Sequence, residues 1–177
     1  MPNNFIFNVT GNPLYTQLTN TYTTPGIESF AQSDAAKSGA LYTLTSGSVS
    51  VTASNSLLLQ VANPSGSGVT MYVWRVTGGV SAANTISLYS GGTVTGGTTP
   101  APFNMNLGST NISAMTTRNA IGTIGGSPVQ FTSVLLAAGY YEIGFNGALI
   151  VPPNRTLTVT IGTGALTASA NISWYEF

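Results

Sequence analysis

The clearest pattern of apolar and polar positions lies in residues 57–76, LLLQVANPSGSGVTMYVWRV. A nearly continuous apolar run, residues 57–61, precedes the turn cluster NPSGSG. An alternating run, residues 69–76, follows the cluster and places its odd and even positions on opposite faces, as a strand's period of two requires. Gly, Pro and Ser between two such runs indicate a tight connection. This stretch therefore predicts two β-strands of a sandwich core.

Short segments of this kind recur from residue 41 to the end of the chain, separated by turns that contain Gly or Pro. Helical periodicity is almost absent, and only residues 28–38 could form a helical turn. The chain is therefore predicted to be all-β, an antiparallel two-sheet sandwich or jelly roll with less than about a tenth helix. The predicted strands are residues 41–44, 48–53, 56–62, 69–77, 85–89, 103–107, 111–116, 129–135, 140–145, 148–151, 156–161 and 168–175.

The segments between these strands that are richest in glycine, residues 91–99 and 121–128, are predicted to be polar surface loops. The apolar positions of the strands predict one buried cluster between the two sheets. Its expected members are Leu58, Val61, Val73, Leu135, Ile143, Val159 and Ile172.

Residues 1–40 differ from the rest and predict a partly extended N-terminal arm ahead of a sandwich domain at residues 41–177. Phe5, Phe7 and Val9 alternate at the two-residue period that would place three apolar side chains in one groove. We expect these three residues to contact a neighbouring subunit. The alternative is an ordinary first strand that pairs within its own sheet.

Charged residues make up only 5% of the chain, four basic against four acidic, so the net charge is zero. A neutral chain has no field to attract nucleic acid or anionic lipid, and we expect neither as a partner. A surface that is poor in charge also gives a monomer little protection against association. Copies of the chain itself and other structural proteins of the same assembly are therefore the expected partners. The alternative is a monomer kept soluble by hydroxyl and amide groups.

The chain has no cysteine and no histidine, which excludes disulfides, thiolate nucleophiles and a serine nucleophile with a histidine base. The few carboxylates do not cluster in the sequence as a calcium loop requires, and no local pair of them suggests a glycosidase. We therefore expect no enzymatic activity, no metal and no cofactor.

The N-terminal residues MPNNFIFNVTGN lack the basic and apolar regions of a secretory signal. No apolar run approaches the roughly 18 residues of a membrane helix. The sequence thus predicts a protein that is not inserted into a membrane and that is assembled inside the cell that makes it.

Two aromatic pairs near strand ends, Tyr140–Tyr141 and Trp174–Tyr175, are candidates for a platform on which sugars stack. Aromatic residues in such places more often belong to the core or to a subunit contact. Arg75 follows Trp74 directly, and we expect it to stack or to pair with one of the few acidic residues.

A resemblance to known structural proteins rests on three segments of this strand-rich, cysteine-free chain with its N-terminal arm: FIFNV, NPSGSGVTMYVWRV and ALIVPPNRTLTV. The chain resembles jelly-roll structural proteins of virions, such as phage capsid decoration, tail and fibre subunits. It is also similar to the sandwich subunits of bacterial surface or spore filaments. The resemblance implies a non-enzymatic, self-assembling structural subunit of a virion or an extracellular filament. The alternative function is a carbohydrate-binding, lectin-like jelly-roll module.

Overall fold

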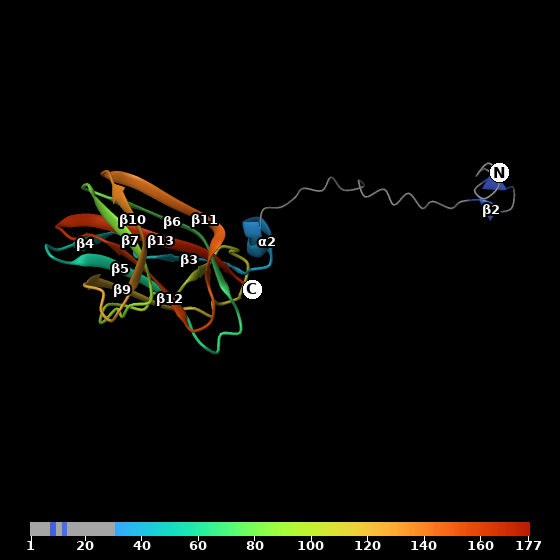
Figure 1. The fold of residues 1–177 in the computed structure, drawn as a ribbon, viewed down its shortest axis with the longest axis horizontal. Helices are drawn as coiled ribbons and strands as arrows, with labels where there is room; N and C mark the ends of the chain where they lie inside the picture. The colour runs from blue at the N-terminus through green and yellow to red at the C-terminus, as the bar shows by residue number, and fades with distance from the viewer. Residues whose placement is uncertain (1–7, 10–11, 14–30) are drawn as a thin grey trace.

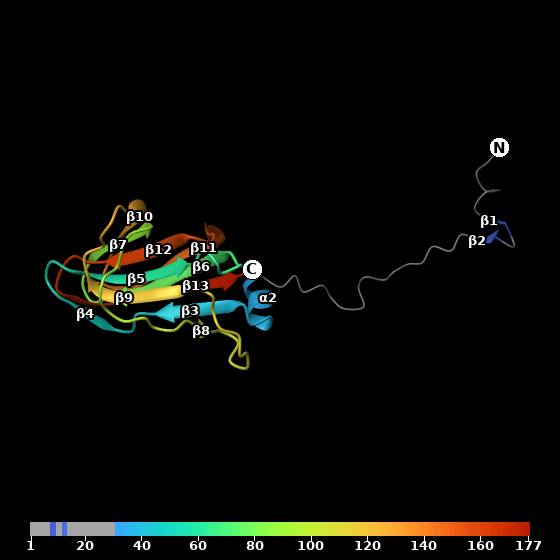
Figure 2. The ribbon, with the colours of Figure 1, turned by 90° about the horizontal axis from the view of Figure 1, so that it is seen from below.

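The structure is a computed structural model that describes residues 8–9, 12–13 and 31–177 (Figure 1). Two antiparallel sheets pack face to face and enclose the main core. The five-stranded sheet has the order β10-β7-β12-β5-β9, and the six-stranded sheet has the order β11-β6-β13-β3-β8, with β4 pairing β13. Figure 2 shows the two sheets as layers, with β10 and β9 at opposite edges.

The strands of the five-stranded sheet are β5 (Ser56–Asn63), β7 (Asn84–Ser90), β9 (Thr116–Gly122), β10 (Val129–Leu136) and β12 (Arg155–Ile161). Those of the six-stranded sheet are β3 (Leu41–Thr45), β4 (Val49–Val51), β6 (Met71–Val80), β8 (Phe103–Asn104), β11 (Gly139–Val151) and β13 (Leu166–Glu176).

Eight of these strands follow the path of a jelly roll. Strand β3 pairs with β13, β5 with β12, β6 with β11 and β7 with β10, all antiparallel. The first of the eight strands thus pairs with the last, the second with the seventh, the third with the sixth and the fourth with the fifth. This is the arrangement of one long antiparallel ribbon rolled into two sheets. Strands β8 and β9 extend the roll at the edge opposite β10 and β11.

The predicted core is confirmed at most of its positions. Val61, Val73, Val159 and Ile172 are buried in one cluster, and Ile143 is partly buried against it. They belong to strands from both sheets, so alternation in each strand turns one apolar face toward the other sheet.

Leu58 and Leu135 were placed wrongly in that cluster. Leu58 is buried, but it lies on the opposite face of β5 from Leu57 and Leu59, where it packs with Val94 and Ala120. The run of leucines therefore serves both faces of one strand. Leu135 is 86% exposed, whereas Leu136, the next residue of β10, is buried in the main core, so Leu135 lies on the face of the strand that turns away from the other sheet.

The loop at residues 91–99, predicted to be a polar surface loop, supplies Val94 to the small cluster around Leu58. Strand β9 was missed, because a strand was predicted at residues 111–116 and a loop at 121–128. Its sequence, TTRNAIG, is mostly polar and lacks a clear alternation of apolar residues. The segment is a strand because its backbone pairs with β5, and a pattern of apolar residues does not indicate this.

Two strands predicted at residues 140–145 and 148–151 are one strand, β11. A register shift against β6 lies between Gly144 and Leu149, where Asn146 and Gly147 have positive φ. Such a bulge lets a strand bend without ending, so a local turn signal does not terminate pairing here.

Among the described residues the single helix is α2 (Ala31–Lys37), which lies within the segment predicted to form a helical turn. Its Ala35 is buried with Leu41 and Tyr175 on the outer face of the six-stranded sheet. Residues 31–37 of the predicted arm thus pack against the sandwich.

Closer to the N-terminus, the short strands β1 (Asn8–Val9) and β2 (Asn12–Pro13) pair with each other. Val9 belongs to β1. Phe5 and Phe7, the other two residues predicted to contact a neighbouring subunit, lie outside the described residues.

Candidate functional site

The four aromatic residues predicted as a sugar platform do not form one exposed surface. Tyr140 on β11 is 72% exposed, whereas Tyr141, Trp174 and Tyr175 are each less than a tenth exposed. Tyr141 and Trp174 belong to the main core between the sheets, and Tyr175 packs in the cluster under α2. Only Tyr140 is therefore available to a ligand among these four.

Each buried ring of this set has a structural partner. The Tyr141 hydroxyl donates to the Ser169 carbonyl at 2.9 Å, and burial raises the pKa of Tyr141. The Trp174 indole Nε1 donates to Glu176 Oε1 at 2.8 Å. Tyr175 stacks on Tyr72 with ring centroids 5.4 Å apart. Buried rings with polar tips need such partners, so these contacts stabilise the fold.

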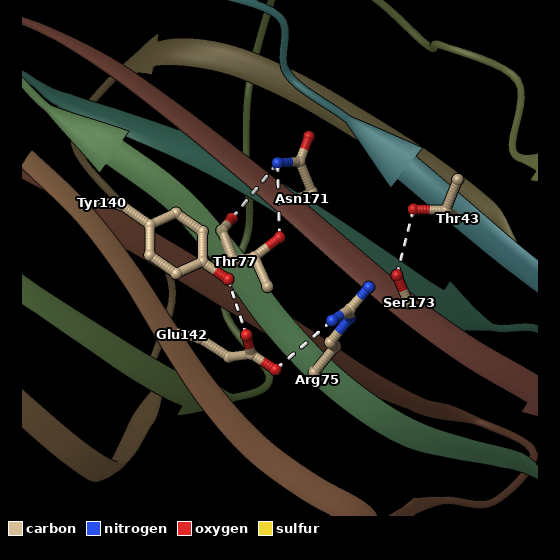
Figure 3. A network of polar contacts seen from close by, with 7 residues as sticks. All are labelled: Thr43, Arg75, Thr77, Tyr140, Glu142, Asn171 and Ser173. Atoms are coloured by element: carbon tan, nitrogen blue, oxygen red, sulfur yellow. Dashed lines mark hydrogen bonds and ion pairs between the residues drawn. The ribbon is translucent and has the colours of Figure 1, made fainter. Parts of the chain in front are cut away.

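The outer face of the six-stranded sheet carries a polar network across β11, β6, β13 and β3 (Figure 3). Arg75 Nη1 lies 3.3 Å from Glu142 Oε1, and the Tyr140 hydroxyl donates to Glu142 Oε2 at 2.6 Å. The guanidinium also lies 4.2 Å from the centre of the Trp74 ring. The expected pairing of Arg75 with an acidic residue and its stacking on an aromatic ring are both confirmed.

The electrostatics of this network follow from its hydrogen bonds. The hydrogen bond from Tyr140, and then the one from Arg75, lower the pKa of Glu142. The same bond to the carboxylate raises the pKa of the Tyr140 phenol. Farther along the face, Thr43 bonds Ser173 and Asn171 bonds Thr77. These contacts cross-link neighbouring strands and leave polar groups facing solvent, a surface suited to hydrogen-bonding a ligand or another subunit.

The strongest apolar feature of the surface lies on the β10–β11 hairpin. Val129, Phe131, Val134, Leu135 and Ile150 are 66%, 44%, 37%, 86% and 52% exposed, and we call these five residues the open edge. Strand β10 pairs with β7 alone, and within the described chain nothing pairs with its other side. The unpaired edge of β10 contains neither a charged residue nor a proline.

A groove indents this part of the molecule. It measures about 230 Å³ and is lined by side chains that include Tyr89, Phe131, Ile150, Pro152 and Arg155. Phe131 faces the groove at the irregularity of β10, where the register with β7 shifts between Gln130 and Thr132. Because it is mostly apolar and partly enclosed, the groove can hold an apolar side chain from another molecule.

A second apolar surface lies on the connection from β8 to β9. Phe103, Met105, Leu107 and Ile112 are 58%, 41%, 84% and 89% exposed. We call residues 103–112 the braced loop. Figure 2 shows the chain after β8 protruding past that edge of the sandwich.

Three asparagines hold the braced loop in place. Asn104 Nδ2 donates to the Gly39 carbonyl at 2.9 Å, and Asn106 Nδ2 to the Lys37 carbonyl at 3.4 Å. Asn111 Nδ2 donates to the Gly39 carbonyl at 3.3 Å. Within the loop, Asn104 Oδ1 accepts from the Asn106 amide at 2.9 Å, a local turn typical of asparagine. The exposed apolar side chains therefore stand on a loop with a defined conformation.

Sequence reasoning missed both apolar surfaces. A strand was predicted at residues 129–135, but a strand pattern does not say whether the strand lies at an edge or in the middle of a sheet. The braced loop was read as strands on each side of a short turn. Its signal was the repeated asparagine in NMNLGSTN, a composition that favours turns over strands.

In the part of the chain that the structure describes, no three side chains of the metal-binding types come together. No helix there is long and apolar enough to cross a membrane. Glu176 is buried and accepts hydrogen bonds from Trp174, Ser113 and the Ala114 amide, so its carboxylate serves to anchor the C-terminal strand.

No protein-family model matches the chain, and no curated protein or solved structure matches it significantly. The function is therefore inferred from the geometry of these surfaces.

Proposed function

We propose that the protein is a non-enzymatic structural subunit of a large self-assembled particle. Such a particle is a virion, in which the subunit serves as a capsid decoration, tail or fibre protein, or an extracellular filament. The subunits associate through sheet edges and the N-terminal arm, and they are assembled inside the producing cell. The observation that carries the proposal is strand β10, an unpaired edge with apolar side chains exposed on both of its faces.

Soluble proteins normally protect a sheet edge, because its unpaired N–H and C=O groups are a template for another strand. Charges, prolines, very short strands, β-bulges or a covering segment are the usual protection. Strand β10 is eight residues long, has no charge or proline, and is uncovered within the described residues; of these features it has only the register shift against β7 between Gln130 and Thr132. An edge of this kind is a site where a strand or an apolar surface of another chain can bind, which supports assembly as its use.

The N-terminal arm is the second contact in this proposal. Residues 1–30 could span up to about 100 Å when fully extended, whereas the 13 residues of β11 span about 43 Å. The length of the segment is therefore sufficient for a contact with a neighbouring subunit. Burial of Phe5, Phe7 and Val9 would contribute on the order of 5 kcal/mol before the cost of ordering the arm.

Light scattering coupled to size exclusion, followed by electron microscopy, tests the proposal. We expect particles or fibres far larger than one chain. Deletion of residues 2–10 is expected to leave a folded sandwich and to impair assembly. A protein that remains a compact monomer at every concentration would overturn the proposal, and normal particles from the deletion variant would remove the arm from it.

A second candidate function, glycan binding, rests on the outer face of the six-stranded sheet. There the exposed ring of Tyr140 lies beside the hydrogen-bonding groups of Glu142 and Arg75. An aromatic ring flanked by polar planar groups is a common way to hold a sugar. Binding on a glycan array by a monomeric protein, lost in Tyr140→Ala, would favour this function over assembly.

A further inference from the structure

The large apolar side chains that the described chain exposes are unevenly distributed. Most of them lie on two surfaces, the open edge and the braced loop. These surfaces occupy opposite edges of the sandwich, because β10 and β11 begin the order of their sheets while β9 and β8 end it. A subunit that associated through one self-complementary patch would need only one such surface.

We infer that the open edge of one copy binds the braced loop of the next copy, in a head-to-tail contact. The inference rests on the proposed function and specifies its principal interface. A contact between two different surfaces leaves one of each free on every pair of subunits. Addition then continues until a ring closes or a filament forms, which is the behaviour expected of a particle subunit.

The shapes of the two surfaces fit this contact. The open edge contains the groove between Phe131 and Ile150. The braced loop presents Leu107 and Ile112, which are 84% and 89% exposed, on a protruding connection. The three asparagine side chains hold that connection before binding, so little conformational entropy is lost when it docks.

The areas also agree. At roughly 150–200 Å² for a fully exposed large side chain, the exposed fractions correspond to about 500 Å² of apolar surface on each side. A standard protein interface buries about 800 Å² on each partner, of which about 60% is apolar. Each surface thus supplies the apolar share of one side of a stable interface, and neither is much larger than the other.

Charge does not oppose the contact. The open edge contains no charged residue, and neither does the braced loop. Arg155 lines the groove, and the braced loop contains no charged residue that could attract or repel it. The contact is therefore expected to be insensitive to salt, unlike one held by ion pairs.

Two full-length variants test the inference by complementation. The edge variant carries Phe131→Glu and Leu135→Glu, and the loop variant carries Leu107→Glu and Ile112→Glu. Ser65→Glu, at an exposed position in the loop between β5 and β6, is the control for an added negative charge. All are compared with the unchanged protein by sedimentation velocity.

In a head-to-tail assembly each variant alone is a monomer, because each lacks one of the two surfaces. An equimolar mixture then forms a complex with twice the mass of one chain and nothing larger, since only one good interface remains. Two variants that had failed to fold could not restore each other in this way. Ser65→Glu is expected to assemble as the unchanged protein does.

Other results overturn the inference. If the loop variant alone still forms a dimer, the open edge associates with itself. If the unchanged protein assembles and both variants do so equally well, neither surface is the interface. In both cases the proposed structural function stands. If the unchanged protein is itself monomeric, the proposed function fails along with the inference.

Discussion

The two edges of the five-stranded sheet are built in opposite ways. The unpaired edge of strand β9 is covered by the loop at residues 91–99, between β7 and β8, through paired backbone hydrogen bonds of 2.8 and 2.9 Å between Thr98 and Asn119. Its Arg118 adds a charge, and Asn119 Nδ2 bonds the Ser46 carbonyl at 3.1 Å. Strand β10 has no covering segment in the described chain and no charged residue.

The chain thus places a covering segment and a charge at one edge of the sheet and neither of them at the other. The β9 edge uses a covering loop and a charge, two of the usual ways to prevent unwanted pairing. The β10 edge uses neither and adds exposed apolar side chains. We therefore interpret the open β10 edge as a surface kept for association.

The largest expected effect comes from placing a charge on each edge in turn. Phe131 on β10 and Ile121 on β9 are both 44% exposed, so Phe131→Lys and Ile121→Lys are matched changes. We expect Phe131→Lys to weaken assembly about 100-fold, as loss of a central interface residue does, and Ile121→Lys to change it less than about twofold. Sedimentation at several concentrations measures both. Equal losses would mean that the two edges do not differ in function.

The second prediction separates side chains that stabilise the monomer from those that serve association. Ile172 is fully buried, and Ile172→Ala should lower the free energy of unfolding by about 2–5 kcal/mol through the cavity it leaves. Leu135→Ala should lower it by less than about 0.5 kcal/mol, because Leu135 is largely exposed.

Urea denaturation of a monomeric background, such as Phe131→Lys, gives these values without a contribution from association. A loss above about 2 kcal/mol for Leu135→Ala would show that β10 is buried in the monomer, and the comparison of the edges would fail.

The third prediction concerns substitutions in the loop at residues 91–99 that should separate this loop from β9. Gly96 and Gly97 both have a left-handed backbone, with φ of 70° and 71°. A Cβ at Gly97 would collide with the Asn119 carbonyl and Ala120, whereas one at Gly96 meets nothing within 4 Å. Gly96→Ala should cost about 1–2 kcal/mol through the backbone alone, and Gly97→Ala should cost about 1–3 kcal/mol more.

Hydrogen exchange at the Thr98 and Asn119 amides gives the independent measurement. Exchange should be faster in Gly97→Ala than in Gly96→Ala, because only the former separates the loop from β9. Equal stability and equal exchange in the two variants would contradict the close contact between loop and edge.

The smallest effect concerns Glu142, the single charged residue of the β10–β11 hairpin. Its pKa is lowered in the folded protein by hydrogen bonds from Tyr140 and Arg75. The ionised carboxylate therefore contributes stability above its ordinary pKa of about 4.5, and this contribution is lost as pH falls through the lower folded value. Glu142→Gln should melt at a lower temperature than the unchanged protein at pH 6, with the difference narrowing as pH falls below 4.5.

Because Glu142 is well exposed to solvent, the difference at pH 6 should be small. Thermal melts of both proteins across this pH range provide the measurement, and a difference that grows toward acidic pH would contradict the sign of the shift.

Local periodicity and composition were sufficient to predict the fold class and most of the core. Strands such as β12 and β13 alternate so regularly that one face must be apolar, and a chain with many such segments buries them most readily between two sheets. The pairing of Arg75 with an acidic residue was expected because the chain has so few charges. These inferences need only local periodicity and composition.

Which apolar side chains remain exposed depends on contacts between segments that are distant in the chain. Strand β10 ends on three adjacent apolar residues, Val134, Leu135 and Leu136, yet Leu136 is buried in the main core and Leu135 is 86% exposed. Leu58 likewise needed the loop at residues 91–99 to cover it, and Trp174 needed the opposite sheet. Burial depends on neighbours distant in the chain, and a local pattern carries no information about where a strand lies in its sheet.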